Sequence, residues 1–287
     1  MIRAFLILLL MLMQMLMLAT PLRAGENFIV LASTTSTQNS GLLDAILPLF
    51  TARTGIEVRV VAVGTGQALR IARNGDADAL LVHHRPSEDA FVAEGYGIDR
   101  RDVMYNDFII VGPADDPAGV GAQPDALAAM RAIAEARQPF ASRGDDSGTH
   151  KKEQELWKAA GITPKGDWYL ETGAGMGATL NFAVAKETYA LTDRGTWISF
   201  GNKGGLKRLF SGDRALFNPY GIILVNPARY PHVKARQARA FSDWLVSDEG
   251  QRAIGAFRIL GRQAFCPNAE NLAAEIADRA ACPAEND

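Results

Sequence analysis

The sequence has few of the residues that build metal sites, disulfide frameworks and nucleic-acid surfaces. Of its 287 residues, two are cysteine, four are histidine and 8% are aromatic, and the formal net charge is −2. Two cysteines are too few for a disulfide-rich scaffold, and no zinc-ligand spacing occurs, so we expect no metal site. A slightly acidic chain argues against nucleic acid as a partner. The length suits one large domain or two of about 100–150 residues each.

Long apolar runs are also missing, apart from one at the N-terminus. Arg3 is followed by a Leu/Met-rich stretch over residues 5–18 and by a small residue, Ala24. This order is typical of a secretory signal peptide, and the run is short for a membrane span, which needs about 20 residues. We expect residues 1–24 to be a signal peptide of an exported protein. An uncleaved N-terminal anchor is the alternative.

Both cysteines, Cys266 and Cys282, lie in the C-terminal tail, residues 266–287. In an oxidising compartment such a pair favours a disulfide that ties the tail to the body of the protein. We therefore expect a Cys266–Cys282 disulfide, with two free thiols as the alternative.

Strand and helix patterns alternate from residue 27 onward, which is typical of α/β folds with parallel sheets. Apolar strand runs are expected at 27–32, 57–63 and 79–82, with helical spacing between them. Pro48 should kink or split the helix that begins at Leu42. Two similar apolar runs, 107–113 and 220–227, lie about a hundred residues apart and enclose a second set of alternating elements. We therefore predict two α/β lobes, joined by two crossover strands that form a hinge.

This organisation predicts five segments and a ligand between the lobes. After the signal peptide, the first lobe takes residues 25–110, the second lobe takes 111–220, and a return segment, 221–265, packs on the first lobe. The tail, 266–287, follows.

Four turns have the composition of anion-binding helix starts. In open α/β sheets ligands collect beyond the carboxyl ends of the strands, where helix N-termini offer unpaired N–H groups and partial positive charge. Glycine lets the backbone approach a ligand closely, and serine and threonine add neutral donors. Two turns belong to each lobe, and they cover residues 33–37, 64–66, 143–149 and 173–179. We predict that they converge on one anion, with these candidate residues: Thr34, Thr35, Ser36, Thr65, Gly66, Arg143, Ser147, Gly148, Thr149 and Gly177.

The third turn is the most informative, because it adds a cation to glycines and hydroxyls. Arg143 offers a planar fork of donors at the start of the helix that follows. Asp145 and Asp146 would repel an anion, so we expect them to face solvent, cap the helix or hold Arg143 in place. One of them could instead accept a hydrogen bond from a protonated ligand.

Seven short blocks distributed over the chain resemble one known family, the periplasmic tungstate-binding components of bacterial tungstate ABC importers. They are 33–36 (STTS), 63–66 (VGTG), 81–83 (LVH), 94–98 (EGYGI), 105–108 (YNDF), 142–149 (SRGDDSGT) and 218–221 (NPYG). The resemblance implies a two-lobed binding protein of type II fold, and a monomer that closes on one tetrahedral oxyanion. It implies tungstate as ligand, no cofactor, and delivery to an ABC permease in the inner membrane. Its site residues carry over to Thr35, Ser36, Thr65, Gly66, Arg143, Ser147, Gly148 and Thr149.

Other interpretations stay open at this point. Molybdate has almost the same size and charge as tungstate, and the same fold could hold phosphate or sulfate. The block 144–148 (GDDSG) with His150 superficially resembles a serine hydrolase site, but Ser147 and His150 stand three residues apart at one helix start. That spacing leaves no acid to orient the imidazole. His83 and His84 are neighbours in a predicted strand and point to opposite faces, so they do not ligate one ion together. We expect one of them to pack and the other to face solvent.

Overall fold

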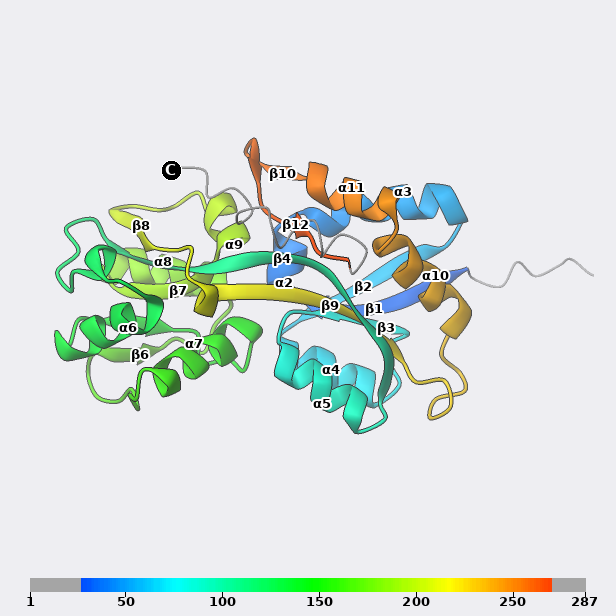
Figure 1. Cartoon of the computed structure of the whole chain (residues 1–287), viewed down its shortest axis with the longest axis horizontal. Coiled ribbons are helices and arrows are strands. Elements are labelled where there is room, and N and C mark those ends of the chain that lie inside the picture. The colour runs from blue at the N-terminus through cyan, green and yellow to red at the C-terminus, as the bar shows by residue number, and fades with distance from the viewer. Residues whose placement is uncertain (1–26, 270–287) are drawn as a thin grey trace, which may run out of the picture.

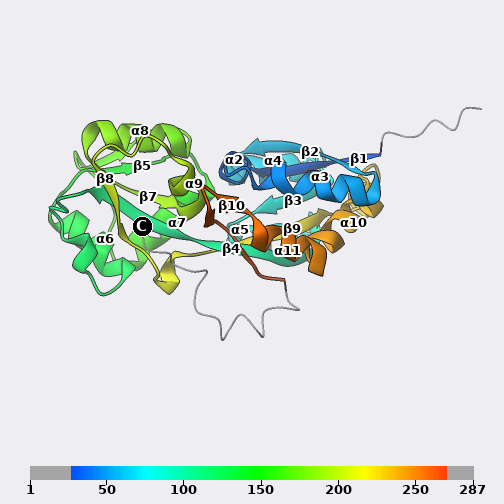
Figure 2. The ribbon, with the colours of Figure 1, turned by 90° about the horizontal axis from the view of Figure 1, so that it is seen from above.

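The computed structural model describes residues 27–269 and forms two lobes that lie side by side, joined by two long strands (Figure 1). Seen from above, the lobes remain separate bodies on either side of these strands (Figure 2). The two-lobed α/β architecture expected from the alternating pattern is therefore confirmed. The predicted signal peptide, residues 1–24, lies outside the described residues.

Lobe one is a sheet covered by helices on both faces. At its centre, β1 pairs in parallel with β2 and with β3, and β3 pairs antiparallel with β9. The elements are β1 (Phe28–Thr34), α2 (Thr35–Asn39), α3 (Leu42–Thr54), β2 (Glu57–Val63), α4 (Thr65–Arg73), β3 (Ala79–Val82), α5 (Arg85–Ala93), β9 (Phe217–Val225), α10 (Ala235–Leu245), α11 (Asp248–Ala256), β10 (Arg258–Ile259), β11 (Arg262–Gln263) and β12 (Cys266–Pro267).

Lobe two repeats the arrangement on a smaller scale. Here β5 pairs in parallel with β6 and β7, while β4 pairs antiparallel with β7 and β8. The elements are β4 (Gly97–Pro113), η1 (Val120–Ala122), α6 (Ala126–Glu135), β5 (Phe140–Ser142), α7 (Gly148–Ala159), β6 (Tyr169–Glu171), α8 (Met176–Lys186), β7 (Tyr189–Asp193), α9 (Arg194–Ser199), β8 (Leu206–Phe210) and η2 (Arg214–Leu216).

The strands β4 and β9 carry the chain from one lobe to the other and back. β4 pairs with β9 as far as Asp107 and with β7 from Phe108 onward, so one strand serves both lobes. The predicted segment boundaries, 110/111 and 220/221, fall inside these two strands. No structural observation tests the five-segment division itself, which stays a prediction.

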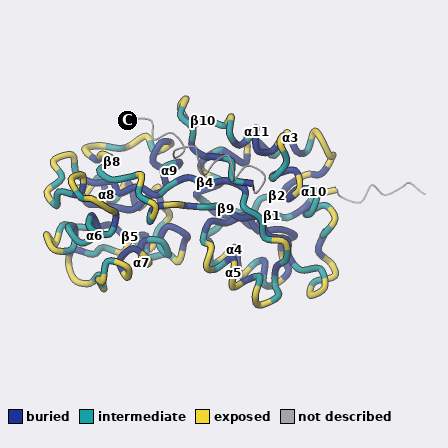
Figure 3. Tube along the Cα trace, in the orientation of Figure 1, coloured by how far each residue is buried: buried dark blue, intermediate teal, exposed yellow. Residues whose placement is uncertain are grey.

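Alternating side chains in the strands build a core on each face of each sheet. In β3, Ala79 and Leu81 pack against α3, α10 and α11, whereas Leu80 and Val82 pack against α4 and α5. In β4, Ile110 faces the helices α6 and α7 and Val111 faces α8 and α9. The period of two in a strand explains this division. The central strands are accordingly buried, and exposure is concentrated in the outer loops (Figure 3).

Three elements differ from the sequence-based expectation. The polar stretch after β1 is a short helix, α2, and not only a turn. Of the two effects expected of Pro48, the split does not occur, because α3 runs through Pro48 to Thr54 as one helix, and the kink stays a prediction. β4 begins at Gly97, ten residues before the apolar run, because its charged first half pairs with β9 and Arg100 forms an ion pair with the buried Glu88 of α5. Among the described residues, none of the helices combines the length and apolar character that crossing a bilayer requires.

Candidate functional site: an anion cradle between the lobes

The turn between β5 and α7 presents a buried cation beside a helix start. Gly144 adopts φ +58°, a left-handed conformation that favours glycine. Ser147 caps α7, and its Oγ accepts a hydrogen bond from the His150 backbone N–H at 3.2 Å. Gly148 and Thr149 then form the first, buried turn of the helix. The local sequence thus provides free N–H groups next to Arg143.

Arg143 is oriented by an acid of its own turn. Its side chain is 4% exposed, and its Nε and Nη2 donate to Asp145 Oδ2 at 3.1 and 2.5 Å. The other Asp145 oxygen accepts from the Ser147 N–H at 3.2 Å. Within residues 27–269 the Nη1 group of Arg143 has no hydrogen-bond partner. Asp145 therefore holds the guanidinium in place and leaves one edge of it for a ligand, while Asp146 is exposed and pairs with Lys151.

Lobe one contributes two further helix starts. Thr34 caps α2, and its Oγ1 accepts from the Thr37 N–H at 3.3 Å. Thr35 is half-buried, and Ser36 is buried with its Oγ 3.1 Å from Thr34 Oγ1. α4 begins at Thr65 after an extended Gly64, whose backbone conformation turns the chain into the helix.

The starts of α4 and α7 meet across the two lobes. A Cβ added to Gly148 would stand 3.0 Å from Thr65 Oγ1 and 2.7 Å from His83 Cε1, so only glycine permits this approach. One added to Gly66 would collide with the carboxylate of Asp146. Across this contact, the hydroxyl oxygens of Thr65 and Thr149 are buried without a hydrogen-bond partner. A pair of buried, unsatisfied hydroxyls costs free energy, unless a ligand satisfies them.

The fourth turn lies beside Arg143 but is more open. Thr179 of α8 bonds to Thr172 at 2.8 Å, and the Thr172 hydroxyl donates to the Ser142 carbonyl at 3.1 Å. These bonds attach the start of α8 to the Arg143 turn. Gly177, the candidate from this turn, is exposed, and nothing lies within 4 Å of a Cβ placed there. The structure thus brings the starts of α4 and α7 into direct contact, links the start of α2 to them through His83, and leaves Gly177 at the rim.

His83 completes the back of the site, and the sequence analysis gave it no role there. The imidazole is 4% exposed, stacks on the Tyr220 ring at 4.7 Å, and places Nε2 3.3 Å from Ser36 Oγ and Nδ1 3.0 Å from Asn218 Oδ1. Burial lowers the pKa of His83 to about 4, although the carboxylate of Asp193 opposes the shift. The ring is therefore uncharged at neutral pH. Only its block, residues 81–83, was a signal in the sequence.

His84 bridges the lobes on the outer side of His83. Its Nε2 lies 2.9 Å from Glu155 Oε1 of α7, and its Nδ1 lies 2.6 Å from Ser87 Oγ. The bond to His84 lowers the pKa of Glu155, which favours the carboxylate. One histidine packs, as expected, and the other makes a cross-lobe contact in place of facing only solvent.

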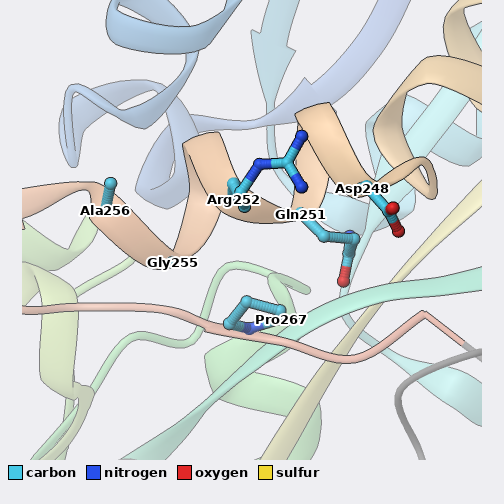
Figure 4. A pocket seen from close by; sticks show the side chains of 6 residues that line it. All are labelled: Asp248, Gln251, Arg252, Gly255, Ala256 and Pro267. Carbon is cyan, nitrogen blue, oxygen red and sulfur yellow. The ribbon is translucent and has the colours of Figure 1, made fainter.

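Two cavities near the lobes differ in what lines them. One, of about 210 Å³, adjoins His83 at the back of the site. It is lined by His83, His84, Lys152, Glu155 and the first residues of β9, Phe217–Pro219. The other, about 560 Å³, lies between α11 and β12, with Gln251 and Arg252 of the helix opposite Pro267 (Figure 4). No residue of the four turns lines the second cavity.

The hydrolase alternative has no supporting geometry. His150 directs its Nδ1 to the Asp146 N–H at 3.1 Å, and only its backbone N–H contacts Ser147. No base therefore faces the Ser147 hydroxyl. Within residues 27–269, no three histidine, cysteine, aspartate or glutamate side chains are grouped to hold a metal ion.

Cys266 is buried in β12, which pairs with β4 at Tyr105. Cys282, its predicted partner, lies outside the described residues. The Cys266–Cys282 disulfide therefore stays a prediction.

Comparison with known proteins agrees with this fold. Residues 20–249 match the PBP superfamily domain. The tungstate-binding protein TupA of Peptoclostridium acidaminophilum is 50% identical over 249 residues, which are 85% of this chain and 87% of the relative. A structure titled as the tungstate ABC transporter from Geobacter sulfurreducens is 49% identical, with a TM-score of 0.75, covering 81% of this chain and 99% of that one. The tungstate-binding protein TupA from Desulfovibrio alaskensis G20 gives the same identity and TM-score, covering 85% of this chain and 99% of that one.

Fold and site define a two-lobed binding protein. The chain belongs to the PBP superfamily and, within it, to the family of these tungstate-binding relatives. The family and fold expected from the seven sequence blocks are confirmed, and the relatives are binding proteins of transporters and not enzymes.

Proposed function

We propose that this protein captures a tetrahedral oxyanion, tungstate, between its lobes and delivers it to an ABC permease. The observation that carries the proposal is the buried Arg143, set beside helix starts whose hydroxyls, on Thr65 and Thr149, are buried and unpartnered. Such a site needs an acceptor with several oxygens, and supplies donors from both lobes. The names of the relatives support tungstate as that acceptor.

The donor set suits an anion without protons. Each hydrogen bond to a charged group contributes about 1.5–3 kcal/mol, and each helix start about 0.3–1 kcal/mol. Thr35, Ser36, Ser147 and the N–H groups of Gly66, Gly148 and Gly177 complete the candidate shell. Closure of the lobes removes water and strengthens every one of these contacts.

Transport places further requirements on the protein. We propose that it is exported with residues 1–24 as its signal, acts in the periplasm as a monomer, and docks on a permease of the inner membrane. The five-segment division belongs to the same proposal, since hinge bending about β4 and β9 would open the cleft for loading. Neither nucleic acid nor a cofactor has a part in it.

The test is isothermal titration of the exported protein with tungstate, molybdate, sulfate and phosphate in a buffer free of oxyanions. We expect one-to-one binding of tungstate and no heat from sulfate or phosphate. A preference for phosphate or sulfate would support the anion site and refute tungstate as its ligand. Silence with all four anions would refute the anion cradle.

Molybdate is the second candidate, because the same donors serve an anion of almost the same size and charge. The ratio of the tungstate and molybdate dissociation constants, measured by competition in the same titration, decides between them.

A further inference from the structure

His83 lies where the two lobes meet, beside the serine and threonine hydroxyls that are proposed to bind the ligand. It follows β3 in lobe one, and its ring stands between Ser36 at the start of α2 and Gly148 at the start of α7. Its Nε2 is 3.3 Å from Ser36 Oγ. The direction of this hydrogen bond determines whether the Ser36 hydroxyl presents its proton or only its lone pairs to a ligand.

An uncharged imidazole carries one N–H and one acceptor nitrogen. If Nδ1 holds the proton, Nε2 takes the Ser36 proton, and the hydroxyl offers only lone pairs to the cleft. If Nε2 holds the proton, it donates to Ser36 Oγ, and the serine proton can then point at an oxyanion or at Thr34 Oγ1, 3.1 Å away. With burial lowering the pKa of His83 to about 4, only these two states matter at neutral pH.

Two buried amides control which state forms. Asn218 Oδ1 faces His83 Nδ1 at 3.0 Å, and Asn218 Nδ2 donates to Asn106 Oδ1 at 2.6 Å. In this orientation Asn106 Nδ2 is buried without a partner, and the Tyr220 hydroxyl, 3.4 Å from Asn218 Nδ2, only accepts. Nδ1 then carries the proton, and Ser36 gives its own to the ring.

Turning both amides by 180° satisfies more of these groups. Asn106 Nδ2 then donates to Asn218 Oδ1, the Tyr220 hydroxyl donates to the same oxygen, and Asn218 Nδ2 donates to His83 Nδ1. One carbonyl oxygen, that of Asn106, is left unpaired instead of one N–H and one O–H. An unpaired carbonyl is the less costly defect in a protein interior.

We propose that His83 is a positioning and specificity residue that donates its Nε2–H to Ser36 and so directs the Ser36 proton at the oxyanion. The proposal rests on the proposed function. Its consequence is that the Ser36 hydroxyl presents its proton to the ligand. A fully deprotonated anion such as tungstate accepts that proton on any of its oxygens, whereas hydrogen phosphate gains no such bond for the oxygen that carries its own proton.

The first test is the tautomer itself. Nitrogen-15 NMR of the histidine-labelled exported protein, with tungstate bound, distinguishes a protonated Nε2 from a protonated Nδ1. The His83 signals are assigned by their loss in His83→Gln. We expect the proton on Nε2 and a bare Nδ1. A proton on Nδ1 would overturn the proposal, and this readout does not depend on any variant retaining affinity.

The second test uses two substitutions with opposite donor capacity. Gln keeps an N–H₂ group near the Nε2 position, and Leu keeps bulk without a donor. We measure the tungstate-to-phosphate affinity ratio by competition of excess phosphate against tungstate at about pH 8, where phosphate carries one proton. We expect this ratio to fall by at least about tenfold in His83→Leu and to stay within about threefold in His83→Gln. His232→Leu, which removes an imidazole bonded to the Gly75 carbonyl outside the cleft, serves as the matched control.

The outcomes separate the two proposals. If the wild-type protein binds no oxyanion, the proposed function fails. If it binds tungstate and the ratio is unchanged in His83→Leu, only the role of His83 is overturned. A Gln variant as unselective as the Leu variant would also overturn it, because the donor and not the shape is the basis of the proposal.

Discussion

Replacing Arg143 tests the charge balance of the site most directly. Arg143→Ala removes the guanidinium edge that faces the ligand and also frees the Asp145 carboxylate that the guanidinium holds. The lost charge-assisted hydrogen bonds are worth about 2–3 kcal/mol. The freed carboxylate repels the anion by a further amount, about 1–2 kcal/mol, which is the scale for two unit charges about 10 Å apart at an effective dielectric constant of about 20. We therefore expect tungstate affinity to fall by about 3–5 kcal/mol, which is roughly two to three and a half orders of magnitude.

The double variant Arg143→Ala/Asp145→Asn separates these two contributions. It still lacks the guanidinium but carries no freed charge, so it should regain about 1–2 kcal/mol of binding over the single variant. Isothermal titration measures all affinities, and thermal unfolding confirms that each variant is folded. Arg137→Ala, which removes an exposed arginine paired with Asp167 in the same lobe, is the control and should bind like the wild type.

Two results would refute the reasoning. Wild-type affinity in Arg143→Ala would place the arginine outside the site. A double variant that binds no better than the single one would show that Asp145 does not act on the ligand through its charge.

Four further predictions follow from contacts of the site and its supporting helix. Thr65→Val should weaken tungstate binding by about 1.5–3 kcal/mol in titration and leave the melting temperature of the ligand-free protein unchanged or raised, because it removes an unpartnered buried hydroxyl. Gly148→Ala should lower affinity at least about tenfold, since its Cβ would stand 3.0 Å from the Thr65 hydroxyl oxygen and hold the lobes apart; unchanged affinity would argue against closure at this contact. Glu155→Gln removes the carboxylate from the cross-lobe contact with His84 Nε2 and should weaken binding by only about 0.2–1 kcal/mol, because the contact is partly exposed. Burial raises the pKa of Glu153, like that of Glu88, to about 7, so the folded protein holds protons that the unfolded chain has released; the free energy of unfolding should fall between about pH 4.5 and 7, and Glu153→Gln should reduce that slope in urea titrations and leave the contribution of Glu88.

The anion-binding turns could be predicted from local sequence because local rules govern them. Adjacent residues in the sequence are enough to recognise a hydroxyl or glycine before a helix start, or a left-handed turn residue such as Gly144. The same locality explains the expectation for Asp145, which lies two residues from the guanidinium that it holds. What local rules do not provide is the partner across the cleft: nothing near Gly148 in the sequence indicates Thr65 as its neighbour.

His83 shows the limit most clearly. Its neighbour Asn218 is 135 residues further along the chain, and Asn218 in turn contacts Asn106, which lies 112 residues back toward the N-terminus. Only the pairing of β4 with β9 brings the two asparagines together, at directly opposed positions of the register. A pattern of single residues in the sequence carries no information on such a pairing.

β4 shows a second kind of limit. Its first half reads as a polar segment, since Asp99 to Asp102 are all charged, yet it forms a strand in lobe one. Pairing with β9 and the ion pair between Arg100 and the buried Glu88 outweigh the absence of an apolar run.

The sequence by itself determined the α/β class and the four helix starts with their cation, because periodicity, capping and glycine act over a few residues; the family followed from resemblance in seven short blocks. The tertiary structure decided which of those helix starts meet, which hydroxyls are left without partners, and that a neutral imidazole stands behind them. The physical reason is the distance along the chain over which each interaction acts. Donor geometry and burial at this site depend on strands that cross between two lobes, and their pairing is a property of the folded chain as a whole.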